Sequence, residues 1–216
     1  MMKQTAYIFD FDGTLVDSMP AWSAKMLNIL AKAGITPPDG LIKHIATLGD
    51  RGTAVYFREE LGVPYSMDEM FAMMDEYALP RYRDEIPLKE TVRDLLASLK
   101  ERGHSLHVLT ASPHKMVDPC LTRLGIFDWF NHVWTCEDFG MVKTNPEIYR
   151  EAVRRIGCGV SDAAFFDDNV GAIRTASAAG LYTVGVFDKT GEDYIGDMKT
   201  IADRFVYTFG ELMTKH

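Results

Sequence analysis

The most informative segment of the chain runs Tyr7-Ile8-Phe9-Asp10-Phe11-Asp12-Gly13-Thr14-Leu15, an apolar strand that ends in two aspartates and a glycine turn. Two carboxylates one residue apart at the carboxyl end of a strand suit a bound divalent cation, with one carboxylate left free to attack a substrate. Taken alone, the same pattern also fits a turn whose acids cap the next element. The segments that follow favour the first interpretation.

Short β-rich runs alternate with helical patterns along the rest of the chain. The strands are expected at Ala6–Asp10, Ser105–Thr110, His132–Cys136, Ala163–Asp167 and Tyr182–Phe187, with a short edge strand at Phe205–Tyr207. The helices between them are expected near Lys89–Arg102, Met116–Leu124, Pro146–Ile156 and Gly171–Ala179. Nearly continuous apolar strands separated by helices indicate an α/β fold with a doubly wound parallel sheet covered on both faces.

Roughly ninety residues separate the first two strands, which is far more than a crossover helix needs. Four helical patterns fill this interval, at Ala21–Ala33, Leu41–Ile45, Thr53–Leu61 and Ser66–Tyr82. We therefore expect two domains, an α/β catalytic core formed by residues 1–16 and 88–216 and a helical cap formed by residues 17–87. The linkers near Asp17–Pro20 and Asp84–Leu88 are candidate hinges.

Each chemically informative residue follows a predicted strand. Asp10 and Asp12 follow the first strand, Thr110-Ala111-Ser112 ends the second, Lys143 lies beyond the third, and Asp167-Asp168-Asn169 ends the fourth. In an open α/β sheet, side chains at these strand ends converge where the winding reverses. Four carboxylates brought together would repel one another unless a cation neutralised them, which predicts a Mg²⁺ site made by Asp10, Asp12, Asp167 and Asp168.

Phosphoryl transfer is the chemistry that fits such a site, because it needs an in-line nucleophile and neutralised charge on the phosphoryl oxygens. We expect Asp10 to be the nucleophile, Asp12 the general acid and base, Thr110 a hydroxyl donor, and Lys143 a fixed positive charge.

The ordered set of motifs resembles the haloacid dehalogenase superfamily, in its phosphatase-like branch with a helical cap between the first two motifs. The D-x-D-G-T motif matches at Asp10–Thr14, the second motif at Thr110, the third at Lys143 before Pro146, and the acidic fourth at Asp167-Asp168. The resemblance covers essentially the whole chain. It implies phosphate binding by Thr110, Ala111 and Lys143, and metal binding by Asp168 directly and by Asp167 directly or through water.

Residues of the predicted cap are candidates for substrate specificity. Trp22 either faces the crevice or packs inside the cap, and Arg51 either contacts a phosphate or carboxylate or is a surface cation. His114 and Lys115, just after the second motif, are weaker candidates. Met67, Met70, Phe71 and Met74 have helical spacing, which fits either the interior of the cap or an adaptable lid.

The composition restricts the partners. The formal net charge of −8 disfavours a general nucleic-acid or anionic-membrane surface, and no segment approaches eighteen consecutive apolar residues. We expect a cytoplasmic protein, a monomer or small homo-oligomer. Cys120, Cys136 and Cys158 fit neither a disulfide framework nor a C-x-x-C metal site.

Three functions remain open. The leading one is a Mg²⁺-dependent phosphatase that acts on a small phosphorylated metabolite through phosphorylated Asp10. The nearest alternative is a β-phosphoglucomutase-like phosphotransferase, which the resemblance also allows. In those mutases a histidine on the first cap helix assists the chemistry, whereas this chain has Trp22 at the matching position, which favours hydrolysis. The alternative from another class is a catalytically silent phosphate-binding regulator, which is disfavoured because no motif is broken.

Overall fold

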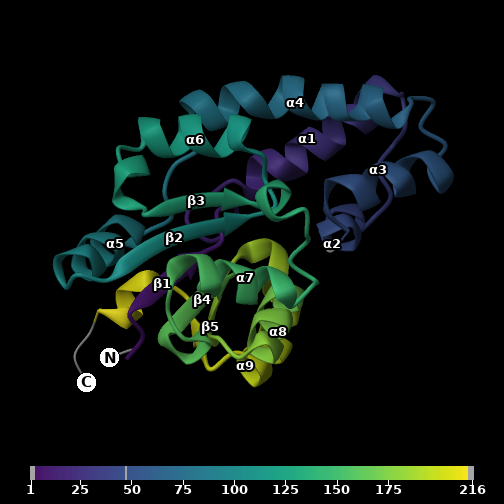
Figure 1. Cartoon of the computed structure of the whole chain (residues 1–216). Helices are drawn as coiled ribbons and strands as arrows, with labels where there is room; N and C mark the ends of the chain where they lie inside the picture. The colour runs from purple at the N-terminus through teal and green to yellow at the C-terminus, as the bar shows by residue number, and fades with distance from the viewer. Residues whose placement is uncertain (1–2, 47, 214–216) are drawn as a thin grey trace.

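A six-stranded parallel sheet with helices on both faces forms the main body of the protein, and a helical insert lies at one end of it (Figure 1). This computed structural model describes residues 3–46 and 48–213. The strands are β1 (Ala6–Phe9), β2 (Ser105–Thr110), β3 (His132–Thr135), β4 (Ala163–Asp167), β5 (Tyr182–Val186) and β6 (Arg204–Val206).

The strand order is β3-β2-β1-β4-β5-β6. The chain therefore builds outward from β1 in one direction through β2 and β3, and then returns to the other side of β1 with β4. This reversal between β1 and β4 is the topological switch point, where α/β sheets place their ligands. The predicted α/β fold with a doubly wound parallel sheet is confirmed, including the short edge strand.

The two faces of the sheet carry separate apolar cores, because side chains of a strand point alternately to opposite faces. Tyr7 and Phe9 pack on one face, and Ala6 and Ile8 on the other. Helices α5 (Val92–Glu101) and α6 (His114–Arg123) cover the first face. Helices α7 (Glu147–Ile156), α8 (Val170–Ala179) and α9 (Ile195–Ile201) cover the second.

Short 3₁₀ turns complete the connections, and neither they nor α9 were expected from the sequence. They are η1 (Phe127–Trp129), η2 (Cys136–Phe139), η3 (Val160–Asp162), η4 (Lys189–Tyr194) and η5 (Phe209–Leu212).

The insert between β1 and β2 consists of α1 (Met19–Lys32), α2 (Leu41–Ala46), α3 (Gly49–Glu59) and α4 (Met67–Asp84). These helices enclose a third apolar cluster of their own, which includes the buried Met70 and Met74 and the partly buried Met67 and Phe71. The methionine-rich stripe therefore packs the interior of the insert, which agrees with the first of the two readings of its spacing.

Helix α4 belongs to both parts of the molecule. Its first half packs in the cluster of the insert through Met70 and Met74, whereas Ala78 and Tyr82 are buried in the core cluster that also contains Phe11. Figure 1 shows α4 passing from the insert over α6. The boundary of the core at residue 88 stays a prediction, but the packing against the sheet domain begins earlier, within α4.

The described residues contain neither a membrane-spanning helix nor a disulfide bond. No helix within 3–46 or 48–213 combines the length and apolar character needed to cross a membrane. The three cysteines are free thiols.

Candidate active site

Asp10 and Asp167 lie side by side at the carboxyl ends of β1 and β4. The backbone N–H of Asp10 donates to the carbonyl of Phe166 at 2.8 Å, which continues the pairing of the two strands beyond Phe9. Asp10 is 5% exposed and Asp167 is 1% exposed. The switch point of the sheet therefore holds two buried carboxylates.

Asp168 completes a group of three acids. One carboxylate oxygen from each of Asp10, Asp167 and Asp168 lies within 4.8 Å of the others. Burial, together with the charges of neighbouring acids, raises the pKa of Asp10 to about 7 against the opposing charge of Lys143. Burial and the charge of Asp167 also raise the pKa of Asp168 well above its usual value. A hard divalent cation fits this oxygen-rich group and would offset the repulsion.

Lys143 supplies the positive charge that the structure places among these acids. Its ammonium group forms ion pairs with Asp10 and, at 2.9 Å, with Asp167. Burial lowers the pKa of Lys143, but the charges of Asp10 and Asp167 outweigh this effect and hold it well above its usual value. The buried hydroxyl of Tyr149 on α7 donates to the carbonyl of Lys143 at 3.0 Å, which anchors the loop to the body of the protein.

Asp12 lies apart from the three grouped acids in the described structure, although the sequence predicts all four in one metal site. One of its carboxylate oxygens accepts a hydrogen bond from the hydroxyl of Tyr82, and the other accepts one from Ser112 Oγ, both at 2.5 Å. The physical reason for the difference is that helix α4 and the loop after β2 each present a hydroxyl donor to Asp12.

The turn after Asp12 brings the first and fourth motifs into contact. Gly13 has φ +72°, and a Cβ atom at this position would lie 2.5 Å from Asp168 Oδ2. Thr14 Oγ1 accepts a hydrogen bond from the backbone N–H of Asp168 at 3.1 Å. Lys89 holds the turn from the other side, because its ammonium group donates to the carbonyl of Gly13 at 2.6 Å. The turn therefore requires glycine for both its conformation and its close approach to Asp168.

The proposed phosphate-binding residues lie at adjacent strand ends. Strand β2 pairs with β1 up to Val108 opposite Phe9, so Thr110 lies at the same end of the sheet as Asp10, and Thr110 is 1% exposed. The backbone N–H of Ser112 donates to Thr110 Oγ1 at 3.0 Å, and Ala111 is exposed between them. Lys143 contacts the carboxylate of Asp10, and Thr110 and Ala111 lie at the neighbouring strand end.

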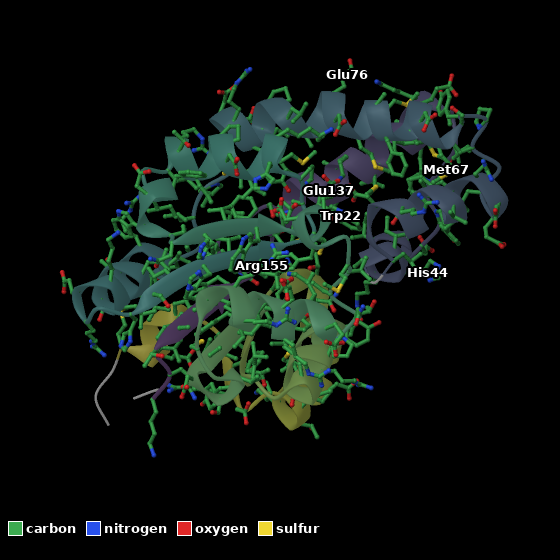
Figure 2. The ribbon with its side chains drawn as sticks, in the orientation of Figure 1. Trp22, His44, Met67, Glu76, Glu137 and Arg155 are labelled. Atoms are coloured by element: carbon green, nitrogen blue, oxygen red, sulfur yellow. The ribbon has the colours of Figure 1, made fainter. Side chains whose placement is uncertain are left out.

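On the insert, Trp22 and Lys25 of α1 both bind Asp50 of α3. The indole N–H of Trp22 donates to one oxygen of Asp50 at 2.9 Å, and the ammonium group of Lys25 pairs with the other at 2.7 Å. The side chain of Asp50 remains 42% exposed. Figure 2 shows Trp22 on the side of the insert toward the sheet, whereas Glu76 of α4 points outward. Trp22 also packs against the cluster inside the insert, which agrees with the second reading of this residue, and its exposure to a crevice stays a prediction.

Arg51, the next residue after Asp50, is exposed and forms no hydrogen bond or ion pair with other described residues. His114 and Lys115 are instead engaged within the protein. His114 lies between Asp118 and Asp138, and Lys115 pairs with Asp75 of α4.

Sequence motifs assign no role to the residues that hold the site together. They are Tyr82 and Ser112 at Asp12, Lys89 at Gly13, and Lys25 and Asp50 on the insert. Ser112 lies two residues after Thr110, at the end of the second predicted strand, and this position could have indicated a role for it. No local pattern marks Tyr82, which lies 70 residues from its partner Asp12.

Comparison with known proteins identifies related chains. The family model described as haloacid dehalogenase-like hydrolase matches residues 4–180. The pyrophosphatase PpaX of Bacillus velezensis is 31% identical over 85% of this chain and 83% of its own length. Hexitol phosphatase B of Escherichia coli K12 is 27% identical over 84% of this chain and 82% of its own length. The structure of CbbY from Rhodobacter sphaeroides in complex with phosphate has a TM-score of 0.81 at 23% identity, covering 97% of this chain and 96% of that one.

Proposed function

The chain belongs to the haloacid dehalogenase-like hydrolase family, and from this premise we propose that it hydrolyses a small phosphomonoester with Mg²⁺, through an aspartyl-phosphate on Asp10. Phosphoric monoester hydrolysis is the activity that its phosphatase-named relatives support. The observation that carries the proposal is the group formed by the buried Asp10 and Asp167 and the half-buried Asp168, with Lys143 paired to the first two.

Asp10, Asp167 and Asp168 would hold the magnesium ion, since their grouped oxygens match its preference for carboxylate ligands. When bound, Mg²⁺ would offset negative charge on the phosphoryl oxygens of the substrate. Lys143 and Thr110, with the backbone at Ala111, would bind those oxygens and orient the phosphorus toward Asp10.

The reaction would proceed in two displacements. In the first, a carboxylate oxygen of Asp10 bonds to phosphorus, the ester P–O bond breaks, and Asp12 gives a proton to the departing oxygen. In the second, Asp12 takes a proton from water, the water oxygen bonds to phosphorus, and the bond to Asp10 breaks. Inorganic phosphate is released, and both carboxyl groups return to their starting states.

Specificity would come from the insert, acting as a cap. Trp22 and the exposed Arg51 are the proposed contacts with the substrate, and Asp50 fixes the indole of Trp22. A cap favours a small phosphorylated metabolite over a macromolecule, and the acidic net charge of −8 supports the absence of nucleic-acid or membrane partners. We also propose a cytoplasmic location and a monomer or small homo-oligomer. Trp22, in place of the histidine expected of a mutase, favours hydrolysis over phosphotransfer.

Phosphate release from a panel of phosphorylated metabolites tests this function. We expect Mg²⁺-dependent turnover that EDTA abolishes, and loss of turnover in Asp10→Asn. Asp94→Asn, which changes an exposed aspartate on α5, is the matched control and should retain activity. Full turnover after exhaustive chelation would contradict the metal requirement, and full turnover of Asp10→Asn would contradict the nucleophile.

A further inference from the structure

Tyr82 joins the end of α4 to the residue proposed as the general acid and base. Its hydroxyl donates to Asp12 Oδ1 at 2.5 Å, and its side chain is buried with a residue exposure of 4%. A hydroxyl at this depth requires a partner, and the carboxylate of Asp12 is the acceptor. The contact therefore satisfies both groups and ties the helix to the turn after β1.

Ser112 holds the second oxygen of the same carboxylate. Its hydroxyl donates to Asp12 Oδ2 at 2.5 Å, while its backbone N–H donates to Thr110 Oγ1 at 3.0 Å. Because both oxygens of Asp12 are held, rotation of its carboxyl group would break at least one of these hydrogen bonds. The carboxylate of Asp12 is thereby held between helix α4 and the loop after β2.

The position of Tyr82 is itself fixed by the core. Its ring stacks on Phe11 with the centroids 6.2 Å apart, and Phe11 separates Asp10 from Asp12. Its backbone carbonyl accepts a hydrogen bond from the guanidinium of Arg123 on α6 at 3.3 Å. The donor hydroxyl therefore stands on a rigid support rather than on a loop, as accurate placement of a reacting group requires.

We propose that Tyr82 is a positioning residue that holds the carboxylate of Asp12 in place for proton transfer to the leaving group. This inference rests on the proposed function, in which Asp12 protonates the departing oxygen. General acid catalysis by a positioned group contributes about 10²–10⁴-fold, and misplacement by ~1 Å can cost about a hundredfold. Loss of one of two donors should remove part of that contribution.

Tyr82→Phe tests the inference, because it removes the donor and keeps the ring against Phe11. We expect kcat for an alkyl phosphate to fall about tenfold, with KM within about twofold of the parent value. The kcat for p-nitrophenyl phosphate, whose leaving group needs little protonation, should change by less than about twofold. Tyr65→Phe is the control, because it also removes a hydroxyl of the insert, one that donates to the carbonyl of Lys32 at 2.9 Å. It should match the parent on both esters.

Asp12→Asn separates the failure of this inference from the failure of the proposed function. Asp12→Asn should lower kcat more for the alkyl phosphate than for p-nitrophenyl phosphate. If it lowers kcat equally for both esters, the acid role of Asp12 is wrong, and so is the inference about Tyr82. If Asp12→Asn shows this selective loss but Tyr82→Phe lowers kcat equally for both esters, or leaves both values unchanged, only the role of Tyr82 is wrong. In the Asp12→Asn background, Tyr82→Phe should cause no further loss on the alkyl ester, whereas an additional loss there would mark a merely structural residue.

A second variant keeps the inference testable if Tyr82→Phe does not fold. Ser112→Ala removes the other donor to Asp12. It should give the same selective loss on the alkyl ester, and an equal loss on both esters would contradict the two-donor arrangement.

Discussion

At the scale of single residues, the site depends on one lysine placed between carboxylates. Lys143 pairs with Asp10 and Asp167, and Asp168 stands next to them under the turn of Gly13. The arrangement of these charges therefore depends on the close approach of Gly13 to Asp168, which a methyl group added at Gly13 would disturb.

Gly13→Ala adds that methyl group. It should destabilise the protein by about 1–3 kcal/mol for the backbone conformation, and more for the contact with Asp168, and it should weaken Mg²⁺ binding. Gly34→Ala is the control, since Gly34 has φ +69° but no atom lies within 4 Å of its added Cβ. Thermal unfolding and Mg²⁺ titration of both variants measure the difference. Equal losses in stability and metal affinity would contradict the proposed close approach of Gly13 to Asp168.

His107 makes stability depend on pH. It is buried on β2 against His132 and Trp134, and burial, followed by the charge of His132, lowers its pKa to about 3. Its unfolded pKa is about 6.5, so between these values the unfolded chain binds more protons and stability falls as the pH falls. At about pH 5 the loss should be about 2 kcal/mol relative to neutral pH.

His107→Phe keeps an aromatic ring in this stack and removes the titration. Thermal unfolding at neutral pH and at about pH 5 should show a smaller acid-induced decrease in Tm for the variant than for the parent. Identical decreases would exclude His107 as the cause.

At the scale of elements, α4 connects two apolar cores. Met70 and Met74 pack in the insert, and Ala78 and Tyr82 pack in the core cluster of the sheet domain that includes residues of α6. Pro80 lies inside the helix within the second of these regions, between Ala78 and Tyr82, and cannot donate a backbone hydrogen bond. The change of packing partner occurs along one helix rather than at the linker of residues 84–88.

Met70→Ala tests whether the insert unfolds as a unit of its own. The side chain is fully buried, so its truncation should cost about 2–5 kcal/mol. Native-state hydrogen exchange should become faster in α1 to α4, with little change in β1, β2 and β4. Leu106→Ala, which truncates a fully buried side chain on β2, should instead accelerate exchange throughout the molecule. Uniform acceleration by Met70→Ala would contradict a separate domain.

The sequence predicted the sheet because the period and composition of its strands are local properties. It predicted Asp10, Lys143, Asp167 and Asp168 at one edge because the ends of parallel strands must meet there. It could not predict the neighbours of Asp12, because Tyr82 reaches it through the packing of a helix from the insert. The pairing of Trp22 and Lys25 with Asp50 likewise depends on how α1 and α3 cross.

At the scale of the whole molecule, the insert contacts the sheet domain from two directions. Lys115 of α6 pairs with Asp75 of α4, and Lys43 of α2 pairs with Asp193 of η4 at 2.6 Å. Within the insert, the hydrogen bond from Trp22 to Asp50 holds α1 beside α3, the helix that carries Asp50 and Arg51. We therefore expect chemistry to reside in the sheet domain and specificity in the insert.

Arg51→Ala tests that division. It should change the ranking of substrates and lower kcat/KM for the best one on the order of tenfold, while generic small esters change little. Arg58→Ala is the control, because Arg58 lies on the same helix and pairs with its neighbour Glu59 at 3.8 Å. An unchanged ranking in Arg51→Ala would require the contacts of the substrate to lie elsewhere in the insert.

The central claim is that Asp10 is the residue that becomes phosphorylated. A crystal structure of the protein with Mg²⁺ and beryllium trifluoride, a mimic of the phosphoryl group, tests it most directly. The account predicts beryllium bonded to a carboxylate oxygen of Asp10, fluorines facing Lys143 and Thr110, and the metal among Asp10, Asp167 and Asp168. Beryllium bonded to Asp12 or Asp168, with Asp10 unmodified, would contradict it.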